Sequence, residues 1–302
     1  MSTEISEHAI EIKNLTRKFR RKMAINDMSL TIPTGCVYGL LGANGAGKTT
    51  LIKHLMGSYI PQEGSVRVLG LDPTKHPKDT LRRVGYLSED RLIPKWMTVA
   101  ELMKFKRAFY PNWGPDFAEK LLETFSLDPG AKIKTLSRGE AAKAELLTAL
   151  AHRPDLLILD EPSFGLDVIA RQEILKAIVR DVAAEGRTVF FSSHLLDEVE
   201  RVSDHVAIMV NGKIVLADSL DHILESHCRM SIRFESPQEK TPIIPGAIHC
   251  TGAGNIWTVI ANGEIEKVRH EVAQANAEVV DEMPPSLEEV FVARTKSKLP
   301  TE

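Results

Sequence analysis

The segment from Gly42 to Thr49, GANGAGKT, constrains this chain more than any other part of its sequence. It matches the pattern G-x-x-x-x-G-K-[ST] and follows a short apolar run at residues 36–41, which predicts a buried strand. Glycines let the backbone curl so that its N–H groups converge on an anion, and the N-terminus of a following helix adds positive charge. The segment therefore predicts a phosphate-binding loop, with Lys48 facing the outer phosphates and the Thr49 hydroxyl available to Mg²⁺.

Three further apolar runs, at residues 156–159, 188–191 and 206–210, are as short and continuous as the run before the loop. Runs of this kind are typical of parallel strands that are buried on both faces. Ile174 and Ile178 share one face of a helix predicted between two of these strands. The alternation of strands and helices predicts a doubly wound α/β domain.

Residues 98–153 interrupt this alternation, because they contain helical patterns and no convincing strand. Thr98 and Glu101 have the spacing of a capping box, which opens a helix whose face carries Leu102, Phe105 and Phe109. We expect an α-helical insert within the α/β domain.

The pattern changes again near residue 220. Two strands and two helices are predicted there, at 230–234, 256–260, 265–275 and 287–293. In the second strand, the residues at 256, 258 and 260 share the face expected to be half-buried. The sequence therefore predicts a large domain at residues 1–219, followed by a small C-terminal α/β domain at 220–302.

Two acids, Asp160 and Glu161, directly follow the apolar run at 156–159. In an open α/β sheet, ligands bind at the carboxyl ends of the strands. A carboxylate at that edge can hold Mg²⁺, and a second can polarise an attacking water as general base. We assign the first role to Asp160 and the second to Glu161. A merely solvated acid pair is the alternative, which the phosphate loop disfavours.

Further motifs, in the same order along the chain, resemble those of the ATP-binding cassette (ABC) family. The segment LSRGE at residues 136–140 is similar to the LSGGQ signature, and residues 163–167 resemble the D-loop. His194 is similar to the switch histidine of the family. Phe19 falls where the family places an aromatic residue against adenine, and Glu89 falls at the position of the Q-loop glutamine.

The resemblance covers residues 10–217, and residues 286–291 resemble the tail of cassettes that serve exporters with separate membrane subunits. It implies an α/β P-loop NTPase cassette with an α-helical subdomain, and ATP hydrolysis coupled to transport. Two cassettes, identical or paralogous, would close head-to-tail around two ATP molecules with Mg²⁺ and drive export through integral membrane permease subunits. Such a subunit lies at the cytoplasmic face of the cell membrane, and no nucleic acid is implied as a partner.

The motifs assign roles to individual residues of this sequence. Glu161 would act as general base, His194 would contact the γ-phosphate, and Lys48 completes the catalytic set. Ser137 and Gly139 of one chain would meet the ATP held by the other. The implied nucleotide-binding residues are Phe19, Gly42, Asn44, Gly45, Ala46, Gly47, Lys48, Thr49, Thr50, Glu89, Ser137, Gly139 and Asp167. The implied metal ligands are Thr49, Asp160 and Glu89.

The chain departs from the family pattern at two motifs. In LSRGE, Glu140 stands three residues after Ser137, so a capping box explains it, and weakened closure through its charge is the alternative. Glu89 stands in place of a glutamine; it is a tolerated isostere, a Mg²⁺ ligand or a partner for a basic helix of the permease. For Phe19, a core position is the alternative to contact with adenine.

Composition limits the remaining functions. The formal charge of −3 argues against a chain that coats nucleic acid, so we interpret the basic cluster at residues 17–22 as a solvated hairpin turn near the nucleotide phosphates. No apolar stretch approaches the roughly 18 residues of a membrane-spanning helix, so export needs a separate permease. A soluble ABC-type ATPase acting in translation or DNA repair is the main alternative. A GTPase or small-molecule kinase is a third, although an Asn-Lys-x-Asp motif is absent.

Overall fold

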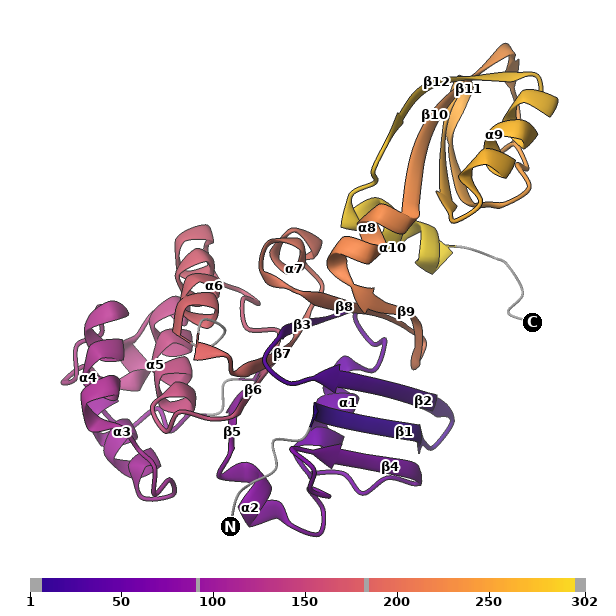
Figure 1. The fold of residues 1–302 in the computed structure, drawn as a ribbon. Helices are drawn as coiled ribbons and strands as arrows, with labels where there is room; N and C mark the ends of the chain where they lie inside the picture. The colour runs from indigo at the N-terminus through magenta and orange to yellow at the C-terminus, as the bar shows by residue number, and fades with distance from the viewer. Residues whose placement is uncertain (1–6, 91–92, 182–184, 297–302) are drawn as a thin grey trace. The chain divides into compact units, whose positions relative to one another are not determined.

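The computed structural model describes residues 7–90, 93–181 and 185–296 (Figure 1). The chain divides into two compact units, one ending at Ala217 and the other beginning at Asp218. The sequence placed this boundary after residue 219. In the part of the chain that the structure describes, no helix has the length and apolar character needed to cross a membrane.

The first unit is built around a sheet with the strand order β5-β6-β7-β3-β8-β9. These strands are β3 (Val37–Leu41), β5 (Val84–Leu87), β6 (Leu156–Asp160), β7 (Thr188–Ser193), β8 (His205–Val210) and β9 (Lys213–Ser219). The pairs β5/β6, β6/β7, β7/β3 and β3/β8 are parallel. Because every residue of β3, β6 and β7 is buried, these strands carry the continuous apolar runs seen in the sequence. The predicted doubly wound α/β fold is confirmed.

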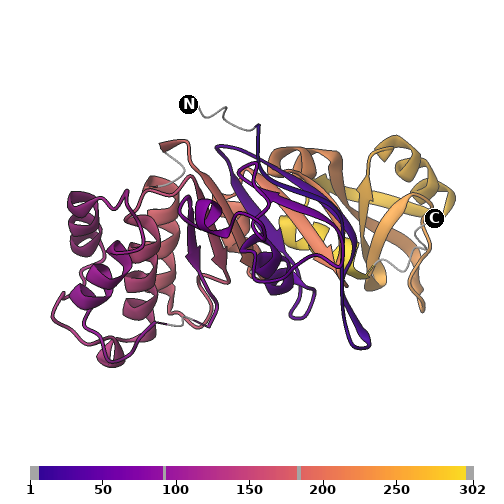
Figure 2. The same cartoon turned by 90° about the horizontal axis from the view of Figure 1, so that it is seen from below.

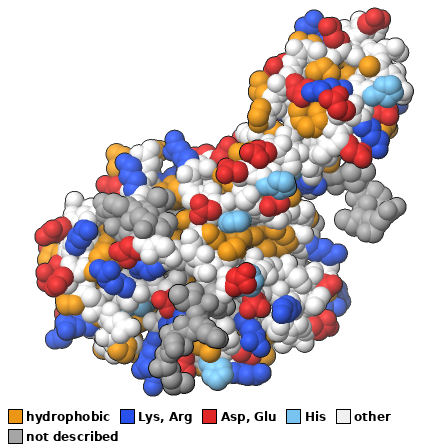
Figure 3. All heavy atoms as spheres, in the orientation of Figure 1, with side chains coloured by type: hydrophobic (Ala, Val, Ile, Leu, Met, Phe, Trp, Pro, Cys, Tyr) orange, Lys and Arg blue, Asp and Glu red, His pale blue; other side chains and the backbone are white. Residues whose placement is uncertain are grey.

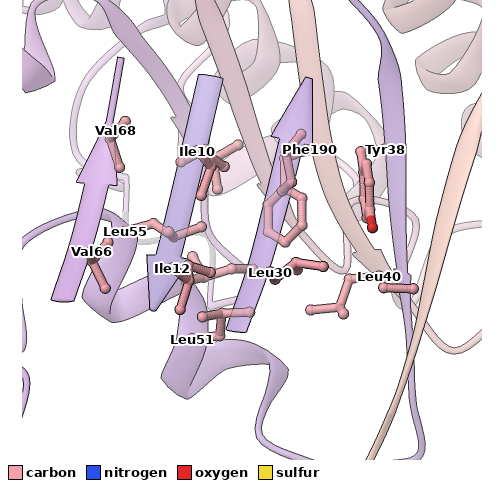
Figure 4. Close-up of a cluster of buried hydrophobic side chains, with 14 of the residues drawn as sticks. Ile10, Ile12, Leu30, Tyr38, Leu40, Leu51, Leu55, Val66, Val68 and Phe190 are labelled. Atoms are coloured by element: carbon pink, nitrogen blue, oxygen red, sulfur yellow. The ribbon is translucent and has the colours of Figure 1, made fainter. Parts of the chain in front are cut away.

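A second sheet of the same unit has the order β2-β1-β4 and is antiparallel. It consists of β1 (His8–Phe19), β2 (Lys22–Pro33) and β4 (Glu63–Val68). A core of buried side chains joins this sheet to α1 (Lys48–Leu55) and to the parallel sheet. Figure 4 shows Ile12 and Leu30 on the antiparallel sheet, Leu51 on α1 and Phe190 on β7 converging in this core. The helix that follows the phosphate loop is thereby fixed between the two sheets.

The insert consists of α3 (Val99–Arg107), α4 (Pro115–Thr124) and α5 (Arg138–Leu150), which gather at one end of the first unit, away from β1, β2 and β4 (Figures 1 and 2). The capping box that opens α3 is confirmed, since the Glu101 N–H donates to Thr98 Oγ1 and the Thr98 N–H donates to Glu101 Oε2. Leu102 is buried as expected, whereas Phe105 and Phe109 are 44% and 59% exposed. The remaining helices of the unit are α2 (Pro77–Leu81), α6 (Val168–Asp181) and α7 (Leu196–Val202).

The second unit contains a sheet with the order β11-β10-β12. Its elements are α8 (Leu220–Ser226), β10 (His227–Gln238), β11 (Ala247–Asn262), α9 (Ile265–Gln274), β12 (Ala277–Met283) and α10 (Leu287–Lys296). The expected half-buried face of β11 is confirmed only in part: Ile260 is buried, but Ile256 is 60% exposed, and the opposite face carries the core residues Trp257, Val259 and Ala261. Apolar residues occupy both faces of this strand, so its alternation alone could not show which face α9 covers.

Charged side chains of both signs are interspersed over the face of each unit that is seen in Figure 3. This face therefore presents mixed charge instead of a continuous basic surface, in keeping with the formal charge of −3.

Candidate functional site

The loop between β3 and α1 adopts a backbone that favours glycine at two positions. Gly45 and Gly47 have φ values of 80° and 119°. A Cβ atom on Gly47 would lie 2.4 Å from the carbonyl oxygen of Ala24 and 2.6 Å from Cε of Met209. Because β2 and β8 press against the loop in this way, no side chain fits there. The strand, loop and helix occur in the order that the phosphate-loop motif requires.

Lys48 is the first residue of α1, and it is only 6% exposed. Its Nζ donates to the carbonyl oxygen of Gly42 at 2.6 Å and lies 3.0 Å from Oε1 of Glu161. A buried ammonium group needs a counter-charge, and Glu161 supplies it. The motif lysine and the second acid of the pair therefore meet directly.

Asp160 and Glu161 are fixed by a serine that the sequence did not single out. Ser192 Oγ donates to Asp160 Oδ1 at 2.7 Å and accepts from the Glu161 backbone N–H at 3.0 Å. Glu161 has a φ of 48°, which costs a residue other than glycine on the order of 1–3 kcal/mol. The only sequence signal for Ser192 was a pair of serines at the end of an apolar run.

His194 directly follows β7, the neighbour of β6, and its side chain contacts Glu161. The register pairs Asp160 with Ser192 on β7, and Ser193 of β7 with Leu41 at the end of β3. The segments that follow β6, β7 and β3 therefore emerge side by side at one edge of the sheet. His194 Nδ1 lies 2.7 Å from Glu161 Oε2, so the buried glutamate is held between a histidine and Lys48.

A cavity of about 310 Å³ opens over the phosphate loop. Its lining includes the predicted residues Phe19, Asn44, Gly45, Gly47, Lys48, Thr49, Thr50, Glu89 and Glu161. It also includes Lys22, Ala24 and Ala43, which were not predicted. Of these, Lys22 belongs to the basic cluster at residues 17–22, which is predicted to form a solvated turn near the nucleotide phosphates, and its Nζ lies 3.5 Å from where a Cβ on Gly45 would be. A cation at that point adds to the positive charge of the loop.

Phe19 lies at the end of β1, half-exposed, and contacts Arg17 of the same strand and Tyr59 of the segment between α1 and β4. The Arg17 guanidinium lies 4.7 Å from the Phe19 ring centre and 4.8 Å from that of Tyr59. The Phe19 and Tyr59 rings meet edge to face at 5.6 Å. Arg17 also donates to the carbonyl oxygen of Ile60. The Phe19 ring on the cavity wall is therefore held in place by Arg17, a member of the basic cluster, and by Tyr59.

The segment LSRGE begins α5. Ser137 is the N-cap residue, and the reciprocal hydrogen bonds between Ser137 and Glu140 confirm the predicted capping box. Ser137 lines a second cavity of about 430 Å³, together with Glu89 and Phe164. Among the residues that the structure describes, Ser137, Gly139 and Asp167 lie outside the lining of the phosphate-loop cavity.

Comparison with known proteins agrees with this architecture. The family model for ABC transporters matches residues 25–164. The bacitracin transport ATP-binding protein BcrA of Bacillus licheniformis is 32% identical over 239 residues, which cover 78% of this chain and 78% of that protein. This chain belongs to the ABC transporter ATP-binding protein family.

Two further relatives of this ABC protein cover different shares of its length. The Nod factor export ATP-binding protein I of a Rhizobium species (strain N33) is 29% identical over 299 residues, which cover 96% of this chain and 98% of that protein. A solved structure of the ATP-binding subunit of an ABC transporter is 27% identical with a TM-score of 0.66, and the match covers 72% of this chain and 92% of that one.

The cavity of this ABC protein collects acidic groups that favour a cation. Burial and the neighbouring Glu161 raise the pKa of Asp160, while hydrogen bonds from Ser192 and Thr49 oppose that rise. Burial and the carboxylates of Asp160 and Glu161 likewise raise the pKa of Glu89. A bound cation would relieve this crowding.

The donor set suits Mg²⁺. A threonine hydroxyl, Thr49, lies in hydrogen-bond contact with the Asp160 carboxylate, and both offer hard oxygen atoms. In the described parts of the chain, no three His, Cys, Asp or Glu side chains form a site that could hold a metal alone. Mg²⁺ is commonly held by one or two protein groups together with substrate phosphates, so these residues fit it.

Proposed function

We propose that this protein binds ATP with Mg²⁺ in the phosphate-loop cavity and hydrolyses it at a site shared between two cassettes. The contact chain from Lys48 through Glu161 to His194 carries the hydrolytic part of this proposal. It places one carboxylate within hydrogen-bond distance of both an ammonium group and an imidazole, beside an anion-binding loop.

Binding follows from the groups that line the cavity. Phe19, braced by Arg17, offers a ring on which adenine stacks. The backbone N–H groups from Asn44 to Thr50 and the N-terminus of α1 hold the phosphates. Thr49 and Asp160, with Glu89 nearby, would hold Mg²⁺, which neutralises phosphate charge as the reaction proceeds.

Hydrolysis follows from the position of Glu161. The arriving phosphates offer Lys48 a second counter-charge, so they compete with Glu161 for its ammonium group. Glu161 Oε1 then becomes available to accept a proton from the attacking water. His194 holds the other carboxylate oxygen, and in this proposal it also contacts the γ-phosphate.

The shared site is supported by where the signature serine lies. Ser137 caps α5 and lines the second cavity, and it is absent from the lining of the phosphate-loop cavity, which supports a contact with a γ-phosphate held by another chain. Two identical cassettes, or this one and a paralogue, would then exchange Ser137 and Gly139 across a C₂ axis. The N-terminus of α5 adds favourable charge toward the phosphate.

Ser137→Arg tests the sharing. The variant should bind ADP within about threefold of wild type, because Ser137 lies outside the phosphate-loop cavity. Its ATP-dependent dimerisation, measured by light scattering, should be lost together with hydrolysis. Glu140→Gln is a matched control at the same helix turn, and it should dimerise because glutamine also completes a capping box. Full hydrolysis by Ser137→Arg would contradict the shared site.

We also propose that hydrolysis drives export through separate permease subunits, with the cassette at the cytoplasmic face of the membrane. Relatives named for Nod factor export and bacitracin transport support this, as does the match to the former over nearly the whole chain. The full chain should co-purify with an integral membrane protein encoded beside its gene. Stimulation of its ATPase by ribosomes or DNA, with no such membrane partner, would contradict export.

A further inference from the structure

Glu198, on α7, is one of the most deeply buried acids in the described parts of the first unit, at 1% exposure. Its carboxylate touches three segments that are far apart in sequence. Ser163 Oγ donates to Glu198 Oε2 at 2.6 Å, and Arg171 Nε of α6 lies 3.0 Å from Glu198 Oε1. Ser193 Oγ lies 3.5 Å from Oε2.

Two of the three contacts flank the hydrolytic pair in sequence. Ser163 stands two positions after Glu161 in the segment that leaves β6, and Ser193 directly precedes His194. A second link joins the same two segments, because the Phe164 and His194 rings meet edge to face at 6.1 Å. Glu198 is thus linked to Glu161 and His194 through Ser163 and Ser193, and it touches neither of the two in the described contacts.

The chemistry of the cluster makes this geometry exacting. Burial raises the pKa of Glu198, while the Ser163 hydrogen bond and the Arg171 charge oppose that rise. Loss of a partner leaves a buried carboxylate partly unsatisfied, which is destabilising. The contacts with Glu198 therefore favour one fixed arrangement of the three segments. The described members of the cluster lie on α6, on α7, at the end of β7 and in the segment after β6, whereas the phosphate loop lies between β3 and α1.

We propose that Glu198 is a positioning residue that holds the Glu161 segment against the His194 turn, so that the general base and the histidine keep their contact during hydrolysis. This inference rests on the proposed function, in which Glu161 and His194 act on ATP. It extends the machinery to Ser163 and Arg171, which act through Glu198.

Two variants of the full chain test the proposal. Ser163→Ala removes one hydroxyl and leaves the Arg171 ion pair, whereas Glu198→Gln keeps an acceptor for Ser163 and loses the charge. Each should lower kcat for ATP by about 10- to 100-fold and leave the Kd for ADP within about threefold, because a misplaced catalytic pair costs rate and not binding. The double variant should be less impaired than the product of the two single losses, because both act on one cluster.

Controls separate positioning from general damage. Glu145→Gln neutralises another buried carboxylate of the same unit, on α5, and should keep kcat within about threefold. Thermal melts report the folded fraction of each variant. Wild-type kcat in both Ser163→Ala and Glu198→Gln would overturn the proposal, as would equal losses in kcat and ADP affinity or an equal loss in Glu145→Gln.

Glu161→Gln, in the same assay, separates this inference from the function on which it rests. If Glu161→Gln keeps the wild-type rate, the assignment of the general base fails. If Glu161→Gln is inactive while both cluster variants hydrolyse normally, the assignment stands and only the positioning role of Glu198 is overturned.

Discussion

Replacing Glu161 by glutamine removes a negative charge 3.0 Å from Lys48 Nζ without changing the size of the side chain. Both groups are about 6% exposed, so water cannot replace the lost charge. Removing one partner of a buried pair costs about 3–5 kcal/mol, and the retained amide carbonyl recovers about 1 kcal/mol as a hydrogen-bond acceptor. The variant should therefore lose about 2–4 kcal/mol of stability, and the lower figure lowers Tm by about 4–8 °C in a unit of this size.

This loss has a consequence for nucleotide binding. Phosphate oxygens restore a counter-charge to Lys48, so nucleotide binding returns to the variant the stability that the substitution removed. Recovery of about 2 kcal/mol tightens the Kd by about 30-fold. We expect Glu161→Gln to bind ADP at least about tenfold more tightly than wild type in isothermal titration calorimetry, even as its ATP hydrolysis falls.

Two control variants isolate the Lys48 contact. Glu89→Gln removes a negative charge from the wall of the same cavity, and it should change the ADP Kd by less than about threefold. Combining Lys48→Met with Glu161→Gln should abolish the gain, because no buried ammonium remains. ADP affinity that is unchanged or weaker in Glu161→Gln, or equally improved in Glu89→Gln, would refute the reasoning.

Three further predictions address other parts of the structure. Gly47→Ala places a Cβ 2.4 Å from a carbonyl oxygen of β2, so ADP binding should be lost in titration and Tm should fall; retained affinity would contradict the loop geometry. Ser192→Ala deprives Asp160 of one of its two hydroxyl donors, at a cost of about 1–3 kcal/mol, and should reduce Mg²⁺-dependent ATPase activity while Mg²⁺-free ADP binding persists. Burial lowers the pKa of His227, which accepts from Arg294 at 3.0 Å, so the unfolded state binds the proton more readily. Stability should therefore fall as pH drops below about 6.5, and melts between pH 7.5 and 5.5 should show a smaller fall in His227→Gln.

Local contacts were the part of the fold that the sequence predicted best. The capping boxes at Thr98 and Ser137 join residues three positions apart, so their geometry follows from spacing. The buried parallel strands are visible because both faces demand apolar side chains. The β1-β2-β4 sheet was not predicted from the sequence. Its strands mix exposed polar and buried apolar positions, and β4 pairs with a strand that lies far from it in the sequence.

The same division holds at the candidate site. Lys48, Asp160, Glu161 and His194 were found because motifs mark them. Ser192 is an ordinary residue type at an unremarked position, and only its contacts give it a role. The contacts of Phe19 with Arg17 and Tyr59, and the buried cluster around Glu198, could not be predicted from the sequence either, because each depends on side chains from separate elements.

The sequence by itself determined which chemical groups this protein carries and, to within about two residues, where the four neighbouring strands β6, β7, β3 and β8 end. Only the tertiary structure decided which of these groups meet. The strand order β6-β7-β3 brings residues 161, 194 and 48 to one edge of the sheet. In the sequence, more than a hundred residues separate Lys48 from both Glu161 and His194. Strand order is set by the packing of the whole unit, so no local pattern encodes it.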